Sequence, residues 1–494
     1  MNPNTIYEKR FDTGTLAELS EDFTLPDYQA EVRRILGVRA QAVIDGKYLS
    51  GDELEADGSV IYTVCYADPD GQIAEASETS AFTARVPLKS GDDRYSPADL
   101  ALSTQTDGAV CRLSGPRKLT LSSRVRMSVL SQKPSDAALA SDDFDTVRRR
   151  VRTVRCACLA ETRGSFEASG EIRDREGMKI AGAQGFVTIS DVHAADGRLC
   201  LKGDATAEVL LLSPDGDPVT ARGRTQVEES VDLPDIPEGV KLRAAVFPTV
   251  VMTEIAAEGG GVISWRIEYD ADAALMKCGE GEITTDAYSP DAPSELEVRE
   301  CRAVSPAAAQ NGRLTVTGRA KTKSGPGAQF VWGWGTASVE RVTLTGGRAQ
   351  AGGTVKLTLV SRSEGELVSE EASLPFRYEW EAVDGARDAE ELVGKTAVTV
   401  TDVGAREDGG EWSLTAELAV SSVLVSEECV TAGCALRPVP PPSAGGEDAK
   451  TQGCAGSRSV MRVYVPGDGE TAWDVEKKFR LRGDAVETEG VYVI

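Results

Sequence analysis

Residues 58–71 read Gly-Ser-Val-Ile-Tyr-Thr-Val-Cys-Tyr-Ala-Asp-Pro-Asp-Gly. Two later stretches follow the same pattern: residues 203–216, Gly-Asp-Ala-Thr-Ala-Glu-Val-Leu-Leu-Leu-Ser-Pro-Asp-Gly, and residues 353–365, Gly-Thr-Val-Lys-Leu-Thr-Leu-Val-Ser-Arg-Ser-Glu-Gly. Each is a glycine, a strand-like run and a turn ending in glycine, and the turn glycines are 145 and 149 residues apart (71 to 216, then 216 to 365). Because glycine readily adopts the positive φ of tight turns, we predict a β-hairpin at each stretch.

The second strand of each hairpin carries a large apolar residue at the same offset. Eleven residues beyond the turn glycines lie Phe82, Val227 and Phe376. In the first hairpin, the period of two places Val60, Tyr62 and Val64 on one face of the strand. Aligning the third hairpin on Gly353 keeps its apolar residues on that face and makes its turn one residue shorter. A one-residue slip would instead turn the apolar face to water.

Strand-like sequence also precedes and follows each hairpin, and helical periodicity is scarce before residue 470. We therefore predict a mainly β protein of three tandem antiparallel β-sandwich-like modules, with a topology that the pattern leaves open. The expected boundaries are residues 1–145, 146–290 and 291–435. A Pro- and Gly-rich linker over 436–457, expected to form neither strand nor helix, leads to a small α+β unit over 458–494.

Composition narrows the classes of function. The 494 residues carry a net charge of −25 and are 41% hydrophobic, which is typical of a globular chain. An isoelectric point near 4.6 argues against nucleic acid as the main partner, because such partners need a basic surface. No run of about 20 apolar residues predicts a transmembrane segment. The first residues lack the features of a secretory signal, so we expect a cytoplasmic protein.

Few residues are suited to catalysis or metal binding. The chain has one histidine, His193, and ten cysteines that do not form metal-binding or disulfide patterns. No phosphate-binding glycine loop is recognisable. We therefore expect no enzyme activity, no cofactor and no metal site. A hydrolase that uses paired carboxylates stays open as an alternative, because acidic residues are abundant.

The C-terminal unit has its own pattern. A strand near residues 461–465 leads to Gly469, and Thr471 is a suitable N-cap for a helix over Ala472–Phe479. Residues 491–494 form a second predicted strand, so we expect a two-stranded sheet with one helix packed on it.

The stretch 469–479, Gly-Glu-Thr-Ala-Trp-Asp-Val-Glu-Lys-Lys-Phe, resembles the LysM signature without gaps. Glu470 and Ala472 replace the usual Asp and Leu, and the short tail leaves no room for a full second helix. The unit is thus similar to a degenerate LysM domain. LysM domains bind N-acetylglucosamine glycans or dock onto proteins. The resemblance implies a partner- or glycan-binding loop at Gly469, Glu470 and Thr471. It also implies that Trp473 lies in the core between helix and sheet.

The rest of the chain resembles SPOCS domains, which occur in spore-coat-associated proteins of endospore-forming bacteria. The similar segments are residues 25–36, the hairpin at 66–71 with Phe82, and residues 286–290 followed by 295–298. Three such modules before a LysM unit match the layout of SipL-type spore morphogenesis proteins. This implies a non-enzymatic factor in the mother-cell cytoplasm that tethers coat layers to the forespore surface. Its LysM-like tail would dock onto the morphogenetic ATPase of the coat's basement layer.

Several alternatives stay open. The chain could instead be a cell-wall protein that binds peptidoglycan through its LysM-like unit. The basic run Arg148–Arg155 is either a docking patch for an acidic partner or a strand that pairs with acidic neighbours. Trp332 and Trp334 either fill a core or stack on a ligand.

Overall fold

The computed structural model describes residues 5–88, 100–136, 139–141, 147–233, 240–439, 463–488 and 490–494. Over these residues the chain is almost entirely antiparallel β-structure, with one helix near the C-terminus. This confirms the predicted mainly β class. The strands form three consecutive groups of six, which we call the first, second and third repeats.

All three repeats have the same topology. The first repeat comprises β1 (Thr5–Thr24), β2 (Arg34–Ser50), β3 (Glu53–Ala67), β4 (Ile73–Pro87), β5 (Leu100–Gly115) and β6 (Lys118–Asp136). The second comprises β8 (Arg148–Ile172), β9 (Lys179–Ala195), β10 (Arg198–Leu212), β11 (Pro218–Asp232), β12 (Lys241–Gly259) and β13 (Val262–Tyr288). The third comprises β14 (Ser294–Lys321), β15 (Gln329–Thr345), β16 (Arg348–Ser363), β17 (Glu366–Glu381), β18 (Val393–Asp408) and β19 (Glu411–Pro438).

In each repeat the sixth strand pairs with the first and the fifth, while strands two, three and four form a separate ladder. The two ladders pack face to face over an apolar core, as in a β-sandwich. Two further pairings involve the third repeat, one with the first repeat and one with the short segment that follows it. β1 bridges β14 at Glu8 and Ala303, and the short β7 (Ala140–Ser141) pairs in parallel with β19.

The glycines that begin the predicted hairpins occupy matching environments. A Cβ on Gly58, Gly203 or Gly353 would lie 2.3, 2.0 or 2.0 Å from a backbone carbonyl oxygen of the neighbouring strand. Across the ladder these glycines face Phe82, Val227 and Phe376 respectively. The glycines that end the three turns all have positive φ, at 78°, 84° and 86°. The repeat predicted from the sequence is therefore a structural repeat.

A β-bulge recurs at one position of all three repeats. The pairing register shifts at Leu36 in β2, at Ala181 in β9 and at Val331 in β15. A bulge re-aims the side chain of its extra residue. Here all three residues contact one apolar cluster, the junction cluster, which lies between the repeats. Its buried members are Leu36, Cys65, Ala67, Ile73, Leu210, Leu212, Val331, Trp332, Trp334, Val360 and Leu367.

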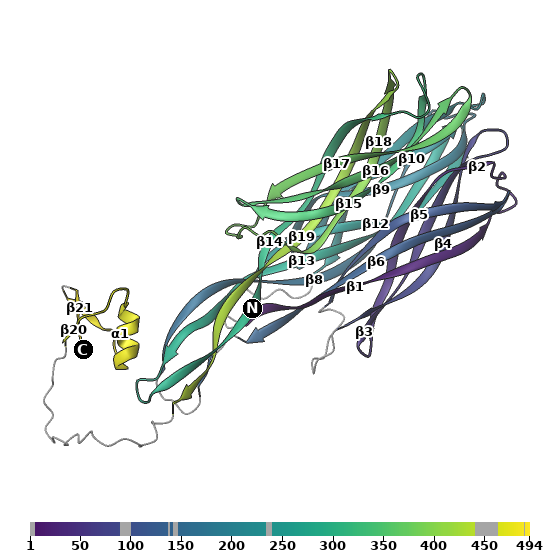
Figure 1. The fold of residues 1–494 in the computed structure, drawn as a ribbon. Coiled ribbons are helices and arrows are strands. Elements are labelled where there is room, and N and C mark those ends of the chain that lie inside the picture. The colour runs from purple at the N-terminus through teal and green to yellow at the C-terminus, as the bar shows by residue number, and fades with distance from the viewer. Residues whose placement is uncertain are drawn as a thin grey trace, which may run out of the picture.

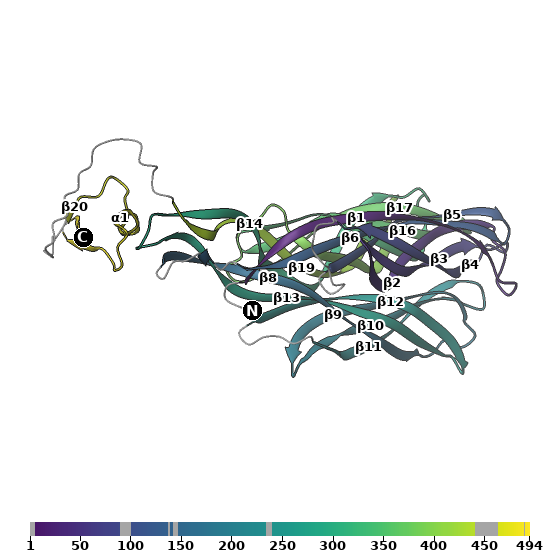
Figure 2. The ribbon, with the colours of Figure 1, turned by 90° about the horizontal axis from the view of Figure 1, so that it is seen from below.

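The three repeats form one body. β4 contacts β9, β11 contacts β15, and β17 contacts β2. The three-stranded ladders of the repeats therefore contact one another in a ring: the first contacts the second, the second the third, and the third the first. A second shared cluster brings Ile6, Val154 and Ala303 together from the first strands of the three repeats. Figures 1 and 2 show the strands running lengthwise through an elongated body, with the C-terminal unit beyond one end. No helix in the described ranges is long and apolar enough to cross a membrane.

The predicted linker begins later than expected. β19 continues to Pro438, and Leu436 is fully buried opposite Leu296 of β14. The prediction that residues 436–438 form no strand was wrong, because Pro438 ends the strand and does not interrupt it. Residues 440–457 of the linker lie outside the described residues.

Candidate interaction site at the C-terminal unit

The C-terminal unit, residues 463–494, is built from one helix and three short strands. These are β20 (Val463–Tyr464), α1 (Ala472–Phe479), β21 (Val486–Thr488) and β22 (Val491–Val493). β22 lies between the other two strands, so the predicted two-stranded sheet has a third strand. The added strand forms because Gly490, at φ +80°, allows a tight turn between β21 and β22. Val475 of α1 and Tyr492 of β22 are buried in the unit.

Thr471 starts the helix as predicted. Its backbone N–H donates to the Asp474 carboxylate at 2.8 Å, and its hydroxyl oxygen accepts from the Asp474 N–H at 3.4 Å. This reciprocal pair is a capping box, which satisfies two backbone groups at the helix start. The hydrogen bonds from Thr471 also lower the pKa of the Asp474 carboxyl.

The Glu470 carboxylate is held by groups of its own unit. It accepts from the Tyr464 hydroxyl at 2.6 Å, from the Gly467 N–H at 2.8 Å and from the Lys478 ammonium at 3.2 Å. These bonds, the one from Tyr464 first, lower the pKa of Glu470. Gly469 has φ +85° and open space around it. The three residues that the resemblance assigns to binding thus shape the loop before α1, and whether they bind a partner or a glycan stays a prediction.

Trp473 does not lie in the core of its own unit, so that prediction was wrong. Its ring meets Tyr288 of β13 edge-on, with 5.4 Å between centroids, and its Nε1 donates to Asp286 at 2.7 Å. Lys477, one helical turn later, donates to the other oxygen of Asp286 at 2.7 Å. The end of β13 thus contacts this face of α1.

Arg148 and Tyr288 extend the same contact. Arg148 at the start of β8 donates to Glu476 at 3.0 Å and to Asp484 at 2.7 Å, and these bonds raise the pKa of its guanidinium. The Tyr288 hydroxyl donates to the backbone carbonyl of Leu481 at 2.9 Å. Asp286 and Tyr288, at the end of β13, therefore contact the C-terminal unit together with Arg148.

The basic run Arg148–Arg155 lies along the first half of β8. Arg152 donates to Glu428 of β19 at 2.6 Å, and Arg155 donates to the backbone carbonyl of Asp384. Together with Arg148, these contacts favour the alternative in which the run pairs with acidic and carbonyl groups of its own chain. Arg149 and Arg150 are exposed.

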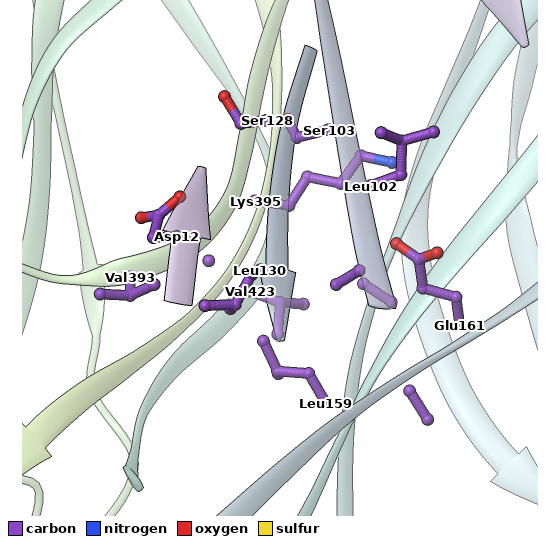
Figure 3. Close-up of a pocket in the computed structure, with 14 residues that line it drawn as sticks. Asp12, Leu102, Ser103, Ser128, Leu130, Leu159, Glu161, Val393, Lys395 and Val423 are labelled. Atoms are coloured by element: carbon purple, nitrogen blue, oxygen red, sulfur yellow. The ribbon is translucent and has the colours of Figure 1, made fainter. Parts of the chain in front are cut away.

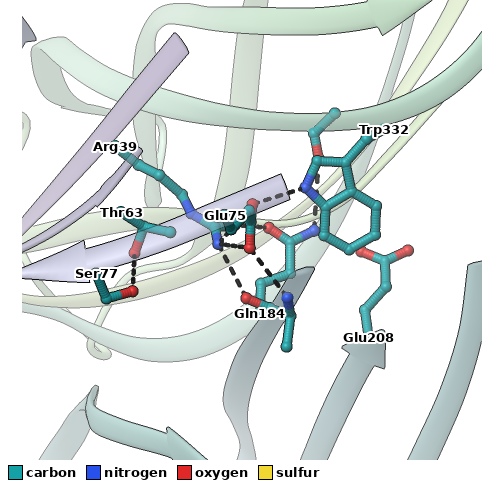
Figure 4. Close-up of polar contacts among 9 residues, drawn as sticks. Arg39, Thr63, Glu75, Ser77, Gln184, Glu208 and Trp332 are labelled. Carbon is teal, nitrogen blue, oxygen red and sulfur yellow. Dashed lines mark hydrogen bonds and ion pairs between the residues drawn. The ribbon is translucent and has the colours of Figure 1, made fainter. Parts of the chain in front are cut away.

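A polar network joins the three repeats beside the junction cluster (Figure 4). Glu75 of β4, with 6% of its side chain exposed, pairs with Arg39 of β2 at 3.2 Å. It also accepts from the backbone N–H of Ala183 in β9 at 2.9 Å and from Trp332 Nε1 in β15 at 3.1 Å. Trp332 and Trp334 are 2% and 6% exposed, so both indoles fill a core. Sequence reasoning missed Glu75, because nothing local distinguishes it from other acidic strand residues.

A small cavity lies where β1, β5, β8 and β18 approach one another (Figure 3). Its volume of about 50 Å³ suffices for a few water molecules. The Lys395 ammonium lies 4.5 Å from the centre of the Phe247 ring, and Glu161 accepts from Lys47 at 2.8 Å. Lys395 and Glu161 are thus engaged with protein neighbours, and the size of the cavity suits water better than a substrate.

Candidate catalytic and metal-binding groups are dispersed. His193 lies on the surface, with Nδ1 3.2 Å from Asp191. The nine cysteines within the described residues are free, and no group of three potential metal ligands occurs among those residues. Comparison with protein-family models, curated proteins and solved structures finds no significant match for this chain.

Proposed function

We propose that this chain is a non-enzymatic interaction protein of the spore coat, which tethers coat layers to the forespore surface from the mother-cell cytoplasm. The body acts as a scaffold, and the C-terminal unit acts as the docking module. The resemblance to SPOCS and LysM domains supplies the biological setting. It also suggests the partner, the morphogenetic ATPase of the basement layer.

One structural observation carries the division of roles. The repeats share apolar clusters with one another, whereas the described contacts between the body and the C-terminal unit are hydrogen bonds, ion pairs and one ring contact. Shared apolar cores make a rigid body, because side chains interdigitate at crystal-like density. A small unit held by polar contacts at one end of that body is suited to engage something else.

Deletion of residues 458–494 tests the proposal in an endospore-forming host. We expect the truncated protein to fold but to lose its position at the forespore, and to lose partners that the full chain captures from sporulating cells. The control is full-length Asp468→Asn, which alters an exposed side chain on the same unit. Normal localisation of the truncated chain would contradict the docking role. Sedimentation of the full chain with insoluble peptidoglycan would support the glycan-binding alternative instead.

A further inference from the structure

The C-terminal unit meets the body through a defined set of groups, which we call the latch contact. On the body it comprises Arg148, Asp286, Tyr288 and Asp291. On the unit it comprises Trp473, Glu476, Lys477, Leu481, Arg482 and Asp484. Most of these groups are charged, and each charged group faces an opposite charge.

Asp286 is the centre of the latch contact. Its two oxygens accept from Trp473 Nε1 and Lys477 Nζ, both at 2.7 Å. Burial alone would raise the pKa of this carboxyl, but the hydrogen bonds from Lys477 and Trp473 outweigh burial and lower it. One carboxylate thus satisfies two donors that lie one turn apart on α1, which fixes both the position and the rotation of the helix.

Two of the ion pairs include a highly exposed side chain, whereas the Arg148–Glu476 pair is more buried, with 26% and 8% of the two side chains exposed. Asp484 is 88% exposed in its pair with Arg148, and Arg482 is 69% exposed in its pair with Asp291. Lys477 is 41% exposed beside Asp286. Ion pairs at such exposure are individually weak and are screened by salt. Salt therefore weakens the pairs of Asp484 and Arg482 most, and it screens the more buried Arg148–Glu476 pair least.

We propose that the latch contact is reversible, and that it covers the face of α1 to which a partner binds. The partner that fits this face presents what the body presents: a carboxylate between Trp473 and Lys477, an aromatic edge against the indole, and a guanidinium for Glu476. Such a partner competes with the body for the same face. This inference rests on the proposed docking role of the C-terminal unit.

Trp473 reports selectively on two states of the full chain: docked, with the latch contact formed, and released, with the latch contact broken. The other five tryptophans are between 1% and 6% exposed, whereas Trp473 is only partly covered and contacts Tyr288 and Asp286 of the body. Acrylamide quenching therefore reports mainly on Trp473. We expect quenching to rise between 0.05 and 1 M NaCl, because the screening length falls from more than 10 Å to about 3 Å.

Charge reversal makes the test specific. Asp286→Lys places two ammonium groups together and should raise the ratio of released to docked molecules at least about tenfold at low salt, because an unpaired charge is left at the contact. Lys477→Glu should act similarly, and the double variant Asp286→Lys/Lys477→Glu should restore much of the protection. Asp468→Lys, on an exposed site of the same unit, is the matched control and should behave as wild type.

Two results would overturn the latch. One is acrylamide quenching that does not change with salt in the wild-type chain and is not raised in either single variant. The other is a double variant that is no less quenched than the single ones. Because these measurements use the chain without a partner, their failure would leave the localisation test of the docking role intact.

Discussion

Substitution of Glu75 tests how the three repeats are held together. Glu75→Ala removes the acceptor shared by Arg39, the Ala183 N–H and Trp332 Nε1. These donors come from all three repeats, so the substitution weakens contacts between repeats and leaves the core of each unchanged. The side chain of Glu75 is not part of the apolar core of the first repeat.

The expected loss can be worked from these contacts. Removing one partner of a buried ion pair costs about 3–5 kcal/mol. Arg39 is 20% exposed and keeps its hydrogen bonds to the Gln184 side chain and the Ala183 carbonyl, so we expect the low end of that range. The unpaired indole N–H belongs to a side chain that is 2% exposed, and an unsatisfied buried donor costs about 1–3 kcal/mol. Taking the lower end of both ranges, we expect a total near 4 kcal/mol. That is a large part of the 5–15 kcal/mol typical of a folded protein.

Urea unfolding followed by tryptophan fluorescence measures this loss. The control is Glu55→Ala, which removes a surface pair with Arg85 inside the first repeat and should cost about 1 kcal/mol or less. A double-mutant cycle with Trp332→Phe should show a coupling of about 1 kcal/mol, because the two variants share one hydrogen bond. A Glu75→Ala variant no less stable than the Glu55→Ala variant would refute the reasoning.

Two other predictions concern single residues. Gly203→Ala should destabilise the protein by about 1–3 kcal/mol, because its Cβ would lie 2.0 Å from the Thr188 carbonyl oxygen. Gly404→Ala, whose Cβ meets no atom closer than 3.9 Å, should have little effect, and equal unfolding midpoints for the two would contradict this. Burial would raise the pKa of Glu370, but hydrogen bonds from the Lys323 N–H, Trp412 and two hydroxyls outweigh it and lower the pKa. Because the pKa of Glu370 is lower in the folded than in the unfolded chain, its ionised form stabilises the fold at pH values above the carboxyl's ordinary pKa. This stabilisation is lost as the pH falls through the pKa of the folded state. At pH 7 the Glu370→Gln variant should therefore unfold at a lower urea concentration than wild type. The difference between the two unfolding midpoints should shrink towards pH 3, and a difference that does not change with pH would count against this prediction.

The repeated part of the fold could be predicted because its signals are local. Alternating apolar residues and turn glycines indicate each hairpin within some fourteen residues. Spacing alone singled out Phe82, Val227 and Phe376, and the structure adds that they lie opposite the glycines that begin the hairpins. The capping role of Thr471 is local in the same sense. Each of these features depends on neighbours that are close in the chain or in register across one turn.

The contacts that organise the molecule could not be predicted, because they join residues far apart in sequence. Glu75 contacts Trp332 across 257 positions, and Trp473 contacts Asp286 across 187. A bulge at Leu36 needs the pairing partner to be known before it can be recognised. Trp473 was assigned to the core of its own unit from the LysM pattern, but that indole contacts Tyr288 and Asp286 of the body instead.

The central claim is that three repeats form one body, with the C-terminal unit held separately. Differential scanning calorimetry of the full chain tests it most directly, by comparing the calorimetric enthalpy with the van't Hoff enthalpy of each transition. We predict one cooperative transition for the three repeats, which Glu75→Ala lowers as a whole, and which deletion of residues 458–494 leaves in place. Three separate transitions, only one of which moves in the Glu75 variant, would contradict the shared body.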